Sequence, residues 1–250
     1  MPTFNTLKFE KRGAIALITL DRPEQKNSFN PEMTVELGRV WEDIKFDDAI
    51  SVTVLTGSGE KYFCTGADFS DYDKGAVKSK YATRDEGIRT LTSKHVQCWK
   101  PVITAVNGMV VGGGFHFITA GDINIATENA TFFDTHVEIG LLPVFEPIEL
   151  MLRMPREAVS RMFLMGRKER MSAKRALELG LISEVVAPGQ LMDRAMELAQ
   201  HLAGRDLRVL MATVELIHKS RELGARQAIL QGLQLRELAG WSVTSRLLEK

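Results

Sequence analysis

The first two thirds of the chain carry short, nearly continuous apolar runs, which are typical of buried β-strands. These runs cover residues 7–9, 14–20, 50–56, 101–106 and 123–127. Between them, apolar residues recur at helical spacing from Pro31 to about Lys45, and a shorter helix is expected over residues 115–120. Strands that alternate with helices predict an α/β fold with parallel strand pairs.

Beyond about residue 156 the pattern becomes mainly helical. Helices are expected over residues 156–165, 172–179, 191–203, 207–221 and 225–238. One strand, over residues 181–186, interrupts these helices. Ser172 is a suitable N-cap for the helix over residues 172–179. The polar stretch 71–94 predicts a loop that runs into a helix ending near Trp99. The last third of the chain is therefore expected to pack on the core or to mediate self-association.

The composition narrows the class of protein. With 250 residues, 44% of them hydrophobic and 26% charged, the chain suits one large soluble domain, alone or with a small appendage. Lys plus Arg and Asp plus Glu number 32 each, and this zero net charge argues against a nucleic-acid partner. No apolar run is long enough to cross a membrane, and residues 1–11 lack the apolar core of a signal peptide. We therefore expect a cytoplasmic protein without a membrane partner.

The two cysteines, Cys64 and Cys98, have neither CxxC spacing nor a nearby cluster of other ligands. This pattern argues against a disulfide framework and against a structural zinc site. Each thiol is instead expected to be a small buried apolar group.

Glycines mark the segments with the strongest chemical signal. Gly112, Gly113 and Gly114 lie where a predicted strand meets a predicted helix, so they leave main-chain N–H groups open to a carbonyl oxygen or an anion. A second bare turn, at Gly66 and Ala67, could present another N–H, and two donors that converge on one oxygen form an oxyanion hole. Tight turns or close helix packing are the alternative explanation. The spacing matches neither a dinucleotide-binding loop nor a P-loop.

Several segments together resemble the crotonase (enoyl-CoA hydratase/isomerase) family. They cover residues 20–28, 59–68, 106–114 and 171–186, in the family's order and near its spacing. The resemblance extends over the whole chain. It implies a crotonase-like spiral of ββα units over residues 1–190, and a C-terminal helical region over residues 191–250 that builds homotrimers or homohexamers.

The resemblance also implies a substrate and its binding residues. The substrate would be an acyl-CoA thioester whose oxygen is held by the N–H groups of Ala67 and Gly113. Coenzyme A would enter as part of the substrate, and no tightly bound cofactor is implied. The positions along the coenzyme A path would be Lys26, Thr65, Asp68 and Phe69, with Asp68 and Phe69 acting mainly through their backbone.

The chain departs from the family at the two catalytic positions. Hydratases carry glutamates there, whereas this sequence has His116 and His136. A neutral imidazole is a competent acid or base near neutral pH, and the dipole at the start of a helix would keep His116 uncharged. Metal binding by the pair is disfavoured because no third ligand is evident.

Nearby carboxylates could complete the site. On an extended backbone, positions two apart share a face, so Asp134, His136 and Glu138 would point the same way. Glu146 lies in a turn that differs from the family pattern, and its apolar neighbours would raise its pKa if it were buried. The alternative for each acid is a solvated surface carboxylate.

These residues predict an acyl-CoA-processing enzyme that stabilises a thioester enolate in a backbone oxyanion hole. Hydration or isomerisation of an enoyl-CoA is the reaction that the family implies. Two alternatives stay open. One is a carbon–carbon bond hydrolase or lyase that uses histidine as acid and base, and the other is a family member that binds acyl-CoA without catalysis.

Overall fold

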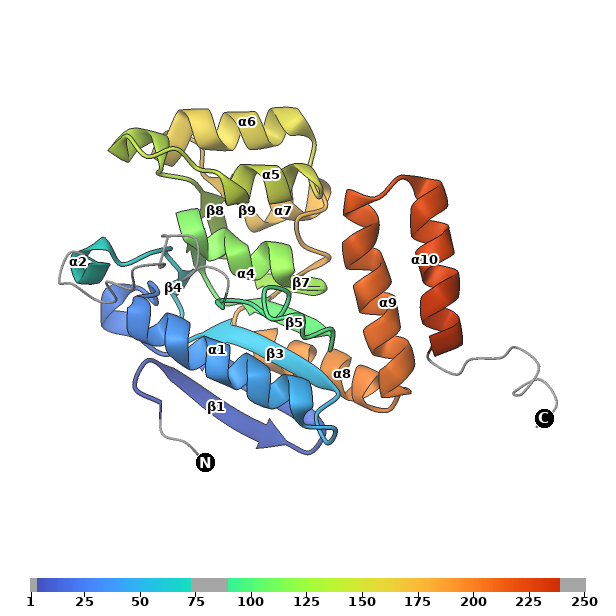
Figure 1. Cartoon of the computed structure of the whole chain (residues 1–250). Coiled ribbons are helices and arrows are strands. Elements are labelled where there is room, and N and C mark those ends of the chain that lie inside the picture. Colours follow the sequence, from blue (N-terminus) through green and yellow to red (C-terminus); the bar gives the residue numbers. More distant parts are fainter. Residues whose placement is uncertain (1–3, 73–89, 239–250) are drawn as a thin grey trace.

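The chain forms two β-sheets and passes repeatedly from one to the other (Figure 1). This computed structural model describes residues 4–72 and 90–238. The larger sheet has the strand order β1 (Leu7–Arg12), β2 (Ile15–Leu20), β3 (Val52–Gly57), β5 (Val102–Val106), β7 (Ile123–Thr127) and β10 (Glu184–Val186). The smaller sheet has the order β4 (Tyr62–Cys64), β6 (Met109–Val111), β8 (Thr131–Phe133) and β9 (Met171–Ser172).

Most neighbouring strands run parallel. Among the described strands, the antiparallel pairs are β1–β2 in the larger sheet and β8–β9 in the smaller sheet. Each of β3, β5 and β7 is followed along the chain by a strand of the smaller sheet. The described residues therefore show the predicted α/β class and a spiral of strand pairs.

Helices cover both faces of the larger sheet, and further helices lie beside the smaller sheet. They are α1 (Pro31–Phe46), α2 (Phe69–Tyr72), α4 (Phe115–Ala120), α5 (Phe145–Met151), α6 (Arg156–Met165), α7 (Ala173–Glu178), α8 (Leu191–Ala203), α9 (Leu207–Lys219) and α10 (Ala225–Leu238). Short 3₁₀ turns are η1 (Pro23–Gln25), η2 (Gly112–Gly114), η3 (Val137–Ile139), η4 (Gly166–Lys168) and η5 (Ser220–Glu222). In Figure 1, α5 and α6 lie above the sheets, α7 lies at the level of β8 and β9, and α9 and α10 form a hairpin at the side.

Alternation along β2 separates two hydrophobic clusters. Ile15 and Leu17 face α8 and belong to one cluster, whereas Ala16 and Ile18 belong to the other, which contains the buried face of α1. Successive strand residues point to opposite faces of a sheet, so a fully apolar strand must be covered on both sides. The predicted C-terminal region therefore begins with a helix that closes the core.

Helix α1 follows directly from its sequence. Asn30 caps it by accepting a hydrogen bond from the Met33 N–H at 2.9 Å, and Pro31 occupies the first helical position. Its apolar stripe is buried, and the Trp41 ring nitrogen donates to the Leu91 carbonyl at 3.0 Å. This helix thereby ties residues 90–93 to the core.

Truncation of Leu37 to alanine is expected to destabilise the fold. The side chain is completely buried in α1, and removal of such a leucine usually costs about 2–5 kcal/mol of unfolding free energy. Val35 lies on the exposed side of the same helix, 48% accessible, and Val35→Ala should change stability by about 0.5 kcal/mol or less. Urea unfolding of both variants tests the pair, and equal losses would contradict the assignment of the buried face.

Two local predictions differ from the structure. The expected helix before Trp99 is absent from its described part, because residues 90–97 form turns, and residues 73–89 of that stretch lie outside the described chain. Helix α5 was not predicted, because the stretch that contains Glu146 was taken as a turn that differs from the family pattern. Proline is tolerated in the first turn of a helix, where no intrahelical partner exists for its missing N–H, and Pro147 lies in that turn.

Cys64 and Cys98 are buried thiols, as predicted. Burial raises the pKa of Cys64 to about 12 and also raises the pKa of Cys98. Among residues 4–72 and 90–238, no helix combines the length and the apolar character needed to span a bilayer.

Candidate active site

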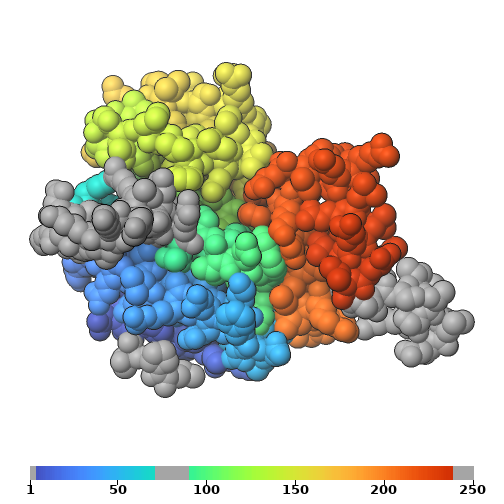
Figure 2. Space-filling model, in the orientation of Figure 1, coloured from blue at the N-terminus to red at the C-terminus, as the bar shows by residue number. Residues whose placement is uncertain are grey.

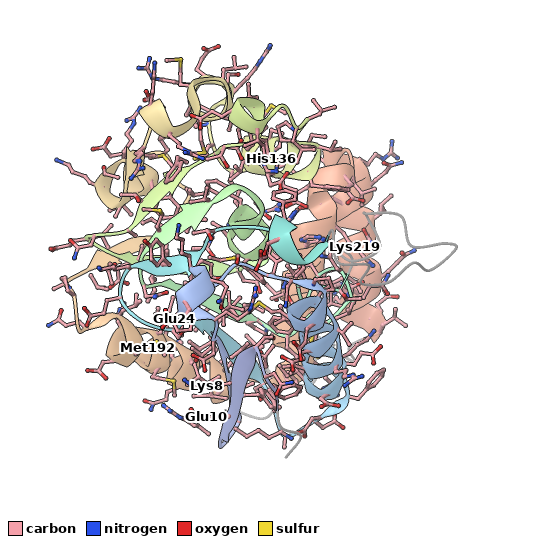
Figure 3. All side chains as sticks on the ribbon, turned by 90° about the vertical axis from the view of Figure 1, so that its left-hand side faces the viewer. Lys8, Glu10, Glu24, His136, Met192 and Lys219 are labelled. Atoms are coloured by element: carbon pink, nitrogen blue, oxygen red, sulfur yellow. The ribbon has the colours of Figure 1, made fainter. Side chains whose placement is uncertain are left out.

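A cavity of about 170 Å³ lies where the ends of β4, β6 and β8 meet the start of α5. All nine predicted site residues except Lys26 and Asp68 contribute to its wall. Figure 3 places His136, which lines this cavity, in the upper half of the molecule, far from Lys8 and Glu10 on β1. The smaller sheet therefore brings together the segments that the glycine pattern singled out.

Backbone donors reach one wall of the cavity from two adjacent strands. The parallel pairing of β4 with β6 places the Gly66–Ala67 turn beside the Gly112–Gly114 turn. Phe29 forms a parallel bridge to Ala67, donating to the Gly66 carbonyl and accepting from the Asp68 N–H, each at 2.9 Å. Because N–H groups alternate in direction along such a bridge, the Ala67 N–H points away from Phe29.

The approach of these two turns requires glycine. Gly66 has a φ of +88°, and a Cβ atom there would lie 2.9 Å from the Gly113 nitrogen. A Cβ atom on Gly113 would lie 2.8 Å from the Phe29 ring. Gly113 also belongs to η2, and N–H groups at the start of a helix have no intrahelical acceptor. The close packing predicted as an alternative for these glycines thus coexists with a place in the cavity wall.

The Glu146 carboxylate lies close to both histidine rings. Its Oε1 atom lies 3.3 Å from the His116 Nε2 atom and 3.8 Å from the His136 Nε2 atom. Both His116 and Glu146 are almost completely buried, at 1% and 5% exposure. His116 comes from the first turn of α4, as predicted, and Glu146 from the first turn of α5. The altered turn after residue 142 therefore brings a carboxylate into the cavity wall.

Asp134 orients His136. Its Oδ1 atom accepts the His136 backbone N–H and its Oδ2 atom contacts the ring Nδ1, both at 2.7 Å. A carboxylate can only accept, so the proton of a neutral imidazole is on Nδ1 and the lone pair is on Nε2, toward Glu146. Asp134 is completely buried. Asp134 and His136 were predicted to point the same way, and the structure brings their side chains into contact.

The same prediction was wrong for Glu138. The backbone leaves the extended conformation after His136 and turns into η3, so positions two apart no longer share a face. Glu138 instead accepts the Arg167 N–H at 2.7 Å and pairs with the Arg167 side chain at 3.1 Å, outside the cavity wall.

The Glu146 carboxyl group loses its proton at a lower pH than its apolar neighbours in the sequence suggested. Burial alone would raise its pKa, but a hydrogen bond from His116 and the charges of His116 and His136 outweigh it, and the pKa lies below the usual value. The expectation of a raised pKa was therefore wrong, because the sequence showed the apolar neighbours and not the imidazoles.

This pKa has a consequence for stability. A carboxyl group whose pKa is lowered by folding stabilises the folded state above its unfolded pKa, and loses this contribution as the pH falls through its folded pKa. The E146Q variant should therefore be less stable than the wild type at neutral pH, and the difference should shrink in acid. Urea unfolding at several pH values measures it. A difference that does not change with pH would contradict the ionised carboxylate.

The comparisons with known proteins agree with this architecture. The family model described as enoyl-CoA hydratase/isomerase matches residues 10–236. The chain belongs to the enoyl-CoA hydratase/isomerase family. One family relative, (E)-benzylidenesuccinyl-CoA hydratase of Thauera aromatica, is 36% identical over 88% of this chain and 85% of its own length. Carnitinyl-CoA dehydratase of Escherichia coli K12 is 33% identical over 89% and 84%.

Solved structures of the family share the fold. An enoyl-CoA hydratase/isomerase from Mycobacterium paratuberculosis has a TM-score of 0.86 at 36% identity, covering 97% of this chain and 92% of that one. An enoyl-CoA hydratase from Bacillus anthracis has a TM-score of 0.84 at 27% identity, covering 93% and 90%. The chain is therefore an acyl-CoA-processing enzyme of the hydratase type.

The residues predicted to bind coenzyme A in this family member fall into two groups. Thr65 and Phe69 line the cavity, and the Thr65 hydroxyl also donates to the Lys26 carbonyl at 3.3 Å. The Asp68 carboxylate instead pairs with Arg22 at 2.9 Å, which leaves its backbone to connect to Phe29. Sequence reasoning gave no role to Arg22, although it lies in the first family segment. Arg22 links the residues after Ala67 to residues 28–29, because it also donates to the Ser28 carbonyl at 2.6 Å.

Within residues 4–72 and 90–238, no group of three or more His, Cys, Asp or Glu side chains is arranged to hold a metal ion.

Proposed function

We propose that this enzyme adds water to the double bond of an enoyl-CoA thioester, or removes it in the reverse direction. The observation that carries the proposal is the Glu146 carboxylate between the His116 and His136 rings, at 3.3 and 3.8 Å, in a cavity that also exposes the Ala67–Gly113 backbone. Two of the relatives are named for adding or removing water on a CoA thioester, which supports the same chemistry here.

In the proposed reaction each group has a role. The N–H groups of Ala67 and Gly113 hold the thioester oxygen, where charge develops as the double bond is attacked. His136 Nε2 takes a proton from water, and Asp134 stabilises the resulting imidazolium. The water oxygen bonds to the β-carbon, and the π electrons move toward the thioester oxygen. His116 Nε2 then donates a proton to the α-carbon, and Glu146 lies between the two rings to return the proton.

Turnover of crotonyl-CoA and of an aryl-enoyl-CoA tests the proposal. Loss of the enoyl absorbance together with a product heavier by one water molecule would support it. Tight binding of both thioesters without turnover would favour a family member that binds acyl-CoA without catalysis, and would refute the hydration proposal.

Removal of either imidazole is expected to lower activity. The H116A and H136A variants should each lose about 10²-fold or more in turnover, the usual effect of removing an acid–base group. His201 provides a matched control, because it is exposed on α8, far along the chain from the cavity residues, and its ring hydrogen-bonds to Arg205. Steady-state kinetics of the three variants is the measurement. Wild-type turnover in both H116A and H136A would exclude a histidine mechanism.

The Asp134–His136 pair also favours a second candidate reaction. A neutral imidazole supported by a buried carboxylate can activate water toward the β-carbonyl of a β-ketoacyl-CoA. The carbon–carbon bond would then break, and its electron pair would remain on the thioester fragment as an enolate held by the backbone donors. Mass analysis distinguishes this reaction, because it yields a shorter acyl-CoA and a free carboxylic acid.

We also propose that the enzyme acts as a cytoplasmic homotrimer or homohexamer, with residues 191–250 as the assembly region and no tightly bound cofactor. Large apolar side chains exposed on α10 support self-association, and these include Ile229, Leu230, Leu233 and Leu238. Light scattering of the purified protein tests the assembly, and a monomer at micromolar concentration would refute it.

A further inference from the structure

A second cavity of about 230 Å³ lies behind His116. Its wall combines α4, α5, residues 92–95 and the end of α9 with η5. In Figure 2 the α9–α10 hairpin (red) forms a lobe next to the lobe of α5 and α6 (yellow-green). His116 lines both this cavity and the one that contains the backbone donors. A group bound in the second cavity would therefore adjoin the candidate active site.

The wall of the second cavity has polar atoms whose bonding capacity is unused. Thr92 Oγ1 and His116 Nδ1 are both buried and have no hydrogen-bond partner within the described part of the chain. Both residues line the cavity, at 2% and 1% exposure. Buried polar groups normally have partners, so this wall fits a polar ligand better than an apolar one.

The charges of the wall point to an anion. Lys94 is neutralised by Asp122 at 2.8 Å, whereas Arg221 has no carboxylate within ion-pair distance among the described residues. Of the two acids of the wall, Glu149 accepts the Thr119 hydroxyl, and Glu222 is exposed to solvent. Both acids keep their charge, but in the described part of the chain neither lies within ion-pair distance of Arg221, so its guanidinium stays open to an anion.

The charge of Arg221 affects the pKa of two neighbouring groups. Burial and then the charge of Arg221 lower the pKa of Arg153 to about 10. Burial, followed by the charges of Lys94 and Arg221, also lowers the pKa of His218. The largest single charge that acts on each of these groups is thus a cation, Arg221 at Arg153 and Lys94 at His218.

The position of Arg221 is fixed by packing around Trp99. The His218 ring lies 5.4 Å from the Trp99 ring, and the Lys219 ammonium lies 5.5 Å from the same ring. These contacts join the end of α9 to residues 94–99, so Arg221 is held beside the cavity.

We propose that the second cavity binds the distal end of the acyl group, and that Arg221 selects acyl chains that end in a carboxylate. The substrate class is then a monothioester of a dicarboxylic acid. This inference builds on the proposed function and names its substrate class. A guanidinium binds a carboxylate through two parallel hydrogen bonds, which a methyl end cannot form.

The test compares matched thioesters that differ only at the distal end of the chain. Hex-2-enoyl-CoA and oct-2-enoyl-CoA are measured against the same chains with a terminal carboxylate, for wild type and R221Q. We expect kcat/KM to favour the carboxylates by at least about tenfold, because hydrogen bonds to charged groups are the stronger ones. R221Q should abolish the preference and R221K should retain part of it. R226Q, which removes an exposed arginine of α10, should leave it unchanged.

Binding separates this inference from the proposed reaction. The affinities of adipoyl-CoA and hexanoyl-CoA are measured by calorimetry, with thermal unfolding as a check that R221Q is folded. A preference for adipoyl-CoA that R221Q removes supports the subsite even if no enoyl-CoA is hydrated. Equal affinities and equal kcat/KM values in the wild type, or a preference that persists in R221Q, would overturn it while the hydratase proposal stands on its own turnover assay.

Discussion

Replacement of Glu146 by glutamine is expected to lower kcat by about 10²–10⁴-fold. Glutamine keeps the shape of the side chain but removes the charge that lies between two imidazoles and the ability to accept a proton. The carboxylate is buried at 5% exposure and its pKa is lowered by His116 and His136 against the effect of burial, so the ionised form is present at neutral pH. Steady-state kinetics with an enoyl-CoA substrate measures the loss.

The control for this variant is Glu138→Gln. Glu138 lies two residues from His136 in the sequence, but its carboxylate pairs with Arg167 outside the cavity wall. Its replacement should leave kcat near the wild-type value. A folded E146Q variant with wild-type kcat would exclude Glu146 from proton transfer, and an equal loss in both variants would indicate a general effect on the fold.

Replacement of Gly113 by valine is expected to lower kcat by about 10²–10³-fold. A side chain there would meet the Phe29 ring, since even its Cβ atom would lie 2.8 Å from that ring and 3.4 Å from the Gly66 Cα. The turn must then shift, and its N–H moves away from the thioester oxygen. Loss of one oxyanion donor typically has an effect of this size.

A comparison of kcat with KM separates a displaced oxyanion donor from weaker substrate binding as the cause of this loss. A displaced oxyanion donor should reduce kcat more than it raises KM, because charge on the thioester oxygen develops mainly in the transition state. Gly224→Ala serves as the control, because a Cβ atom there would have no atom within 4 Å. Wild-type kcat in a folded G113V variant would mean that the Gly113 N–H does not hold the oxygen.

The periodicity of apolar residues predicted the elements that are buried on one side, or on all sides, over several turns. Helices α6, α8 and α10 have the expected bounds, and the Ser172 hydroxyl caps α7 as expected. The strands of the smaller sheet have two or three residues each, which is too short for a period to appear. Their positions depend on pairing between distant segments, and a single sequence carries no direct signal of that pairing.

The candidate site was predicted unevenly for a similar reason. The Asp134–His136 contact joins positions two apart, and the spacing rule that indicated it was wrong for Glu138, where the backbone is no longer extended. Glu146 was singled out by its altered turn, but its charge state depends on His116, which is thirty positions away and which only the fold brings to 3.3 Å. The second cavity joins residues 92–95 to α9, and no sequence pattern indicated that these segments meet.

Burial of both cysteines affects how the protein responds to oxidation. Only the thiolate reacts readily with alkylating agents and peroxides, and the pKa of about 12 at Cys64 keeps that thiol protonated under ordinary conditions. Cys64 lies next to the glycine turn of residues 112–114, since its carbonyl oxygen would be 2.4 Å from a Cβ atom on Gly114. Modification of this buried thiol thus requires local opening around β4, so the rate at which it is labelled reports how often this part of the cavity wall opens.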